Sequence, residues 1–107
     1  MNAAFKASWM ILALTLACST YTFTDAGGDI FKTKSCAACH GATGAGDTTM
    51  GKNLKLRDLG SADVQKQSDD ELTTIIAKGK GKMPPYDGKL TKEQIGEVVK
   101  FIRSIKK

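Results

Sequence analysis

The feature that most constrains this 107-residue chain is the run CAACH at residues 36–40, which holds its only histidine and two of its three cysteines. Two thiols separated by two residues can each form a thioether to a vinyl group on the same edge of one porphyrin. The adjacent imidazole then projects toward the iron, for which it is a good ligand. Cys-x-x-Cys-His is the sequence pattern of such attachment. We predict one covalently bound haem c, with Cys36 and Cys39 as its thioether residues and His40 as an axial ligand.

Two other uses of a close cysteine pair fit the sequence less well. A thioredoxin-like redox pair lies at a strand-to-helix junction, and no stretch of this chain shows the period-two alternation of a strand. A structural zinc site usually has four protein ligands, whereas residues 27–107 offer only Cys36, Cys39 and His40. The sequence therefore favours haem.

The sixth iron ligand is predicted from the two methionines that follow the CAACH run. Met50 lies so soon after His40 that only a short loop is available to carry it around the porphyrin edge. Met83 comes much later and precedes Pro84-Pro85, which fix φ and hold the preceding residue in an extended conformation. A methionine on such a stiff loop is not the usual core filler of a helix face. We predict Met83 as the second axial ligand.

An iron held by His40 and Met83 has no vacant position for oxygen or peroxide. The chain has no second histidine to assist peroxide chemistry. Methionine ligation raises the reduction potential of haem iron. We therefore expect a single-haem electron-transfer protein that shuttles one electron between redox partners, with no catalytic residues.

The first residues are typical of an export signal. Lys6 precedes the apolar run WMILALTLAC at residues 9–18, and no acidic residue occurs before Asp25. This pattern is typical of a secretory signal peptide, and the run is shorter than the about 20 residues that span a membrane. We predict a cleaved signal peptide over residues 1–26, a mature domain over residues 27–107 and a periplasmic location.

A second cleavage site stays open. The residues LACS at 16–19 loosely resemble a bacterial lipoprotein box, and cleavage there would leave a lipid on Cys18. The protein would then be anchored to a membrane. We expect membrane association only in that case or if the signal is not cleaved.

The charge favours acidic partners. The chain carries 16 basic and 11 acidic residues, a formal net charge of +5, which favours transient docking to acidic redox proteins. No nucleic-acid-binding motif accompanies this charge. We expect Lys78, Lys80 and Lys82 around the exposed haem edge, and Arg57 as a candidate partner of a haem propionate, because guanidinium suits carboxylate geometry.

Helix signals dominate the mature region. A short helix is predicted over residues 29–35, a second begins after Ser68, and a third begins after Thr91. The last two start with capping boxes and continue with apolar residues at helical spacing. The stretches 41–51 and 78–87 are rich in glycine or proline and predict loops.

Taken together, these stretches resemble the class I c-type cytochromes, specifically small bacterial monohaem cytochromes c. The matching segments are Ile30-Phe31, SCAACHG at 35–41, KMPPYDGKLT at 82–91 and IGEVVKFIRSI at 95–105.

The resemblance implies an all-α cytochrome c fold, with three to five short helices wrapped around one covalent haem. The N- and C-terminal helices would cross, with Gly28 and Phe31 near Phe101, and Tyr86 and Leu90 would line the pocket. It also implies His40 and Met83 as axial ligands. The protein would be a free carrier or, alternatively, a tethered or subunit domain of a larger respiratory or dehydrogenase complex.

One departure concerns the support of His40. Many relatives have a proline after the loop that follows the histidine, and its carbonyl accepts the imidazole proton. This chain has KNL at 52–54 instead, so the acceptor for His40 stays open.

Overall fold

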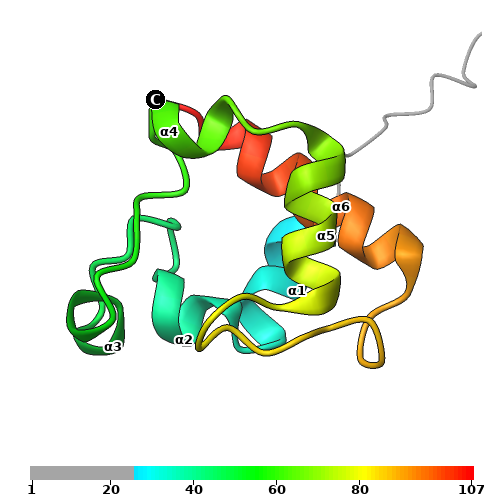
Figure 1. Cartoon of the computed structure of the whole chain (residues 1–107), viewed down its shortest axis with the longest axis horizontal. Helices are drawn as coiled ribbons and strands as arrows, with labels where there is room; N and C mark the ends of the chain where they lie inside the picture. Colours follow the sequence, from blue (N-terminus) through cyan, green and yellow to red (C-terminus); the bar gives the residue numbers. More distant parts are fainter. Residues whose placement is uncertain (1–25) are drawn as a thin grey trace, which may run out of the picture.

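The computed structural model describes residues 26–107, whose fold is all-α, as predicted (Figure 1). The helices are α1 (Ala26–Thr33), α2 (Cys36–His40), α3 (Thr49–Asn53), α4 (Ala62–Gln65), α5 (Asp69–Lys78) and α6 (Lys92–Ser104). Within this range the only β-type pairing is an isolated bridge between Lys80 and Met83. Residues 1–25, which include Cys18 and all but the last residue of the predicted signal peptide 1–26, lie outside the described range.

Helices α1 and α6 pack against each other at a crossing, as the resemblance implies. Phe31 is 1% exposed, and its ring centroid lies 4.8 Å from that of Phe101. Gly27 lies directly against α6, because a Cβ there would overlap the main-chain carbonyl of Glu97. Gly28, the glycine that we expected at the crossing, is also buried. This contact joins the two ends of the described chain.

The two capping boxes form as predicted. The Ser68 hydroxyl accepts from the Glu71 amide at 3.0 Å, and the Thr91 hydroxyl accepts from the Gln94 amide at 3.1 Å. In return, the side chains of Glu71 and Gln94 accept from the N-cap amides. These bonds satisfy amides that a helix start otherwise leaves unpaired. They fix where α5 and α6 begin and which of their faces are buried.

Three single-turn helices were not predicted, so the described range has six helices instead of three to five. The CAACH run itself is α2, α3 begins inside the stretch predicted as a loop, and α4 lies between α3 and α5. A helix of one turn shows no periodicity, and tertiary contacts decide whether it forms. For α3, the Thr48 hydroxyl accepts from the Gly51 amide at 2.8 Å and donates to the Cys39 carbonyl at 2.6 Å.

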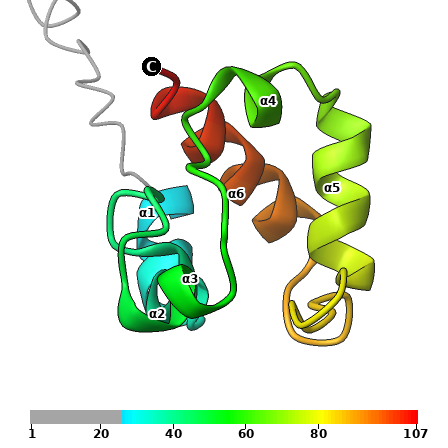
Figure 2. The same cartoon turned by 60° about the vertical axis from the view of Figure 1, so that its left-hand side comes forward.

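The two views show how these helices surround the centre of the molecule (Figures 1 and 2). Helix α5 lies on one side and α2 with α3 on the other. Helix α6 runs between them, in contact with both α1 and α5. The irregular segment after α5 closes the end of this arrangement. The fold therefore places the CAACH run and the Met83 segment around one central space.

Candidate functional site

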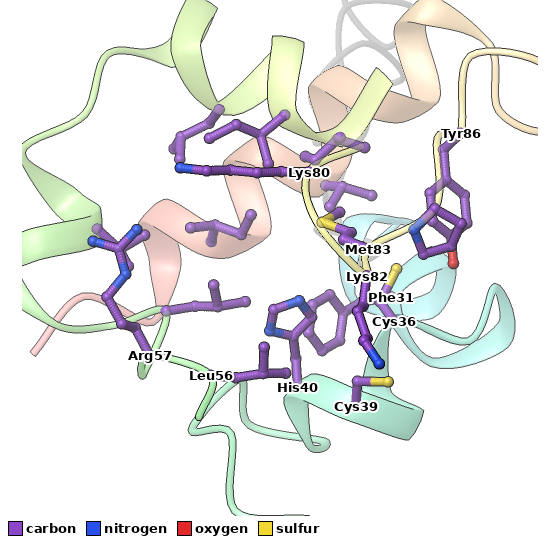
Figure 3. Close-up of a pocket in the computed structure, with 18 of the residues that line it drawn as sticks. Phe31, Cys36, Cys39, His40, Leu56, Arg57, Lys80, Lys82, Met83 and Tyr86 are labelled. Carbon is purple, nitrogen blue, oxygen red and sulfur yellow. The ribbon is translucent and has the colours of Figure 1, made fainter. Parts of the chain in front are cut away.

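A cavity of about 350 Å³ occupies this central space. Its walls are mostly apolar and come from α1, α2, α4, α5, α6 and the irregular segments between them (Figure 3). The apolar lining includes Phe31, Leu56, Leu72, Ile76, Val98 and Ile102. The volume lies within the range of about 300–1,000 Å³ that is typical of small-molecule and cofactor sites.

Helix α2 brings both thiols and the imidazole to this cavity. Cys36, Cys39 and His40 occupy positions i, i+3 and i+4 of one helix, which share a face, and all three line the cavity. Both cysteines are free thiols, with Cys36 buried and Cys39 half-buried. Burial raises the pKa of Cys36. The predicted cluster therefore assembles on one helical face.

The His40 ring lies beside Phe31, with their ring centroids 6.2 Å apart. Burial lowers the pKa of His40, which favours the neutral imidazole that binds metals. Its Nδ1 is buried, and among the described residues no group hydrogen-bonds to it. The described residues therefore do not supply the acceptor that the sequence left open.

Met83 enters the same cavity from the segment after α5. Figure 3 shows His40 rising from α2 on one side of the cavity and Met83 on the other. Two main-chain hydrogen bonds hold this segment: the Lys80 amide donates to the Met83 carbonyl at 3.1 Å, and the Met83 amide donates to the Lys80 carbonyl at 2.9 Å. Met50, by contrast, lies on α3, is 50% exposed and is not among the cavity-lining residues.

Tyr86 anchors the segment that carries Met83. Its amide donates to the Ile76 carbonyl at 3.0 Å, and its hydroxyl donates to the Lys34 carbonyl at 2.9 Å. Burial raises the pKa of the Tyr86 phenol, so the hydroxyl stays protonated and can donate. Tyr86 lines the cavity as expected, whereas Leu90 is buried in the core and is not part of the lining.

The cationic residues that the sequence singled out separate into two groups. Arg57, Lys80 and Lys82 line the cavity. Lys78 does not line it, and its Nζ lies 3.4 Å from a carboxylate oxygen of Asp87. Of the three lysines expected around the haem edge, Lys80 and Lys82 therefore lie at the cavity, and Lys78 lies outside its lining beside an acidic partner.

Sequence reasoning missed a polar network that holds one wall of the cavity. Arg103 of α6 donates to the carbonyls of Gln65 at 2.9 Å and of Gln67 at 2.5 Å, and it pairs with Asp69 at 2.8 Å. Gln67 lines the cavity. The partners lie more than 30 positions away along the chain, so no local pattern identifies them. Only the position of Arg103 near the end of an apolar helix stripe marks it in the sequence.

The residues present fit haem. Two thiols and an imidazole on one helical face, a methionine opposite and apolar walls match the donor set and the surface of a covalently bound porphyrin. Among residues 26–107, no group of three or more His, Cys, Asp or Glu side chains is placed to hold a bare metal ion. None of the helices in this range is long and apolar enough to span a membrane.

Comparisons with known proteins also indicate a haem protein. Residues 23–102 match the family described as cytochrome C oxidase, cbb3-type, subunit III. Cytochrome c6 of Leptolyngbya boryana is 35% identical over 77 residues, which cover 72% of this chain and 86% of the relative. Cytochrome c-555 of Methylococcus capsulatus is 30% identical over 78 residues, covering 72% of this chain and 58% of the relative.

A solved structure shares the fold. The KustC0563 c-type cytochrome superposes with a TM-score of 0.69 at 32% identity, and the match covers 76% of this chain and 98% of that one. The region matched by the family includes both the CAACH run and Met83. The chain therefore belongs to the class I c-type cytochromes, small all-α electron carriers, not enzymes, that hold a covalently bound haem c.

Proposed function

We propose that this cytochrome carries one electron at a time on an iron ligated by His40 and Met83, with the haem joined to Cys36 and Cys39 by thioethers. The observation that supports this assignment most directly is the placement of His40 and Met83 on opposite sides of one apolar cavity. Both cysteines lie on the same helical face as His40. The remaining methionine of the described range, Met50, lies on α3 and does not line the cavity.

The chain's own residues set the conditions for this transfer. When bound, the haem supplies a one-electron ferric–ferrous couple. The thiols of Cys36 and Cys39 keep it attached, and His40 binds as a neutral imidazole. Met83 would offer its thioether sulfur to the iron, which would favour the reduced iron relative to a second imidazole. The mostly apolar walls would keep water from the haem, and two main-chain hydrogen bonds hold the Met83 segment in place.

Absorption spectra of two methionine variants test the ligand assignment. The reduced wild-type protein should show a low-spin c-type spectrum, and the oxidised protein should show the weak long-wavelength band of an iron–sulfur bond. Met83→Ala should abolish that band, whereas the matched variant Met50→Ala should retain it. Loss of the band in Met50→Ala, or its survival in Met83→Ala, would show that the assignment is wrong.

We also propose that the protein is exported to the periplasm, with residues 1–26 removed as a signal peptide. The apolar run at residues 9–18 supports this placement, since it is long enough for a signal peptide but too short for a span. Cleavage before Cys18 with lipid attachment is the alternative. The mass of the exported chain distinguishes the two.

We propose acidic redox proteins as the docking partners. The net charge of +5 and the exposed Lys82 at the cavity rim support this, because such charges steer weak, salt-sensitive encounters. The matched family is described as an oxidase subunit, so a complex subunit is the second candidate. Purification of the native protein as a monomer would favour the free carrier over the subunit.

A further inference from the structure

We propose that Lys80 binds a haem propionate, that Arg57 binds the other, and that this pair fixes the end of the haem opposite the thioethers. The inference rests on the proposed haem site and extends it. Lys80 was expected from the sequence only as part of a docking surface. The structure instead gives it a place in the lining of the cavity.

The charged ends of Arg57 and Lys80 lie where the haem propionates are expected. In Figure 3 the sulfurs of Cys36 and Cys39 lie on one side of His40, and the charged ends of Arg57 and Lys80 lie on the other. On a haem, the vinyl groups that form thioethers lie on the opposite half of the ring from the two propionates. Attachment at the cysteines therefore directs the two carboxylates toward Arg57 and Lys80.

The charge balance of the cavity supports this orientation. Among the described residues, its lining holds three cationic side chains, those of Arg57, Lys80 and Lys82, and no aspartate or glutamate. Within residues 26–107, none of these three forms an ion pair, although Lys78 and Arg103 do. Unpaired cations beside apolar walls fit a ligand that is apolar over most of its surface and carries carboxylates at one end.

The nearest acidic residue in the sequence does not neutralise Arg57. Asp58 adjoins it, but the Asp58 carboxylate lies 2.5 Å from Nζ of Lys107 and also accepts from the Gly60 amide at 2.8 Å. These interactions lower the pKa of Asp58 and keep it ionised for Lys107. The guanidinium of Arg57 is thereby left available for a carboxylate of the ligand.

Lys80 and Lys82 differ in the direction of their side chains, and this difference assigns the propionate to Lys80. The two hydrogen bonds that pair Lys80 with Met83 place both residues at the base of one tight turn. In Figure 3 the Lys80 side chain runs toward the side of the cavity where Arg57 lies, whereas the Lys82 side chain is drawn on the side of the cysteine sulfurs. Substitution of Lys82 removes the same charge from the same cavity lining as substitution of Lys80 does. Lys82 is therefore the matched control.

Resonance Raman spectra of the loaded protein test this assignment, because the propionate bending bands respond to hydrogen bonding at the carboxylates. Lys80→Gln and Arg57→Gln should each shift one propionate band and lower the reduction potential. Lys80→Arg should restore both toward the wild-type values. Lys82→Gln should leave the propionate bands unchanged. Wild-type bands in Lys80→Gln, or an equal shift in Lys82→Gln, would overturn the proposal.

Failure of this inference can be separated from failure of the proposed function. If the haem site itself is wrong, the wild-type protein lacks the c-type spectrum or the iron–sulfur band before any lysine is changed. If only the propionate assignment is wrong, the wild-type absorption spectrum is as expected, and Lys80→Gln leaves the propionate bending bands unchanged. The side chains of Lys80 and Lys82 are both exposed in part, so neither substitution disturbs the core.

Discussion

Gly79 permits the tight turn that carries Met83. It ends α5 with φ of 77°, a left-handed conformation that glycine adopts without strain. A Cβ built there would lie 2.5 Å from the main-chain oxygen of Met83. The turn can therefore bring Met83 back toward α5 only because this position has no side chain.

Gly79→Ala should weaken the iron–sulfur band and destabilise the protein. Gly81 is the control, because it also has a positive φ, 58°, but nothing lies within 4 Å of a Cβ built there. Gly81→Ala should cost about 1 kcal/mol from backbone strain alone. Gly79→Ala should cost more and displace Met83. Urea unfolding and the absorption spectrum measure the two effects, and equal behaviour of both variants would contradict this account.

Single residues also show how far the sequence predicts the site. Cys36, Cys39 and His40 follow from a local motif, and Met83 follows from its neighbouring prolines, so their presence in one cavity was predictable. The unpartnered Nδ1 of His40 and the contacts of Arg103 with Gln65 and Gln67 were not. Both depend on which distant main-chain groups the fold brings close, and no local pattern contains that information.

At the scale of helices, the crossing of α1 and α6 is the contact that closes the fold. Phe31 and Phe101 pack together there, and Gly27 lets α1 approach the Glu97 carbonyl of α6. The apolar spacing and the capping box predict α6 well, because both are local signals. Helix α1 packs against α6 through residues far apart in the sequence, and no local pattern identifies that contact.

Gly27→Ala should separate these two helices. Its Cβ would overlap the Glu97 carbonyl and lie 3.0 Å from Cβ of Phe101. We expect a loss of about 1–3 kcal/mol in the free energy of unfolding, the range for overpacked sites. Gly96→Ala in α6 is the control, because its Cβ meets open space and alanine favours helix by about 0.5–1 kcal/mol. In urea titrations the free energy of unfolding should be highest for Gly96→Ala, intermediate for the wild type and lowest for Gly27→Ala. A Gly27→Ala protein as stable as the wild type would contradict the crossing geometry.

At the scale of the whole molecule, the net charge of +5 should govern encounters with redox partners. The rate constant for oxidation of the reduced protein by ferricyanide should fall several-fold as salt screens the attraction, and the rate with a cationic oxidant should rise. Stopped-flow mixing at several ionic strengths measures both.

A pair of lysine variants locates the surface where this attraction acts. Lys82 lines the cavity, whereas Lys66 does not line it and pairs with Asp63 at 3.5 Å. Lys82→Gln should slow oxidation by ferricyanide more than Lys66→Gln, although each substitution removes one charge. Equal slowing in the two variants would mean that the net charge acts without a preferred docking site.

The intact mass of the purified exported protein tests the central claim most directly. We expect the mass of residues 27–107 plus one haem, unchanged by acid treatment that extracts non-covalent haem. The same mass reports the cleavage site and any lipid on Cys18. A polypeptide mass without haem, or haem lost on acid treatment, would contradict covalent attachment through Cys36 and Cys39.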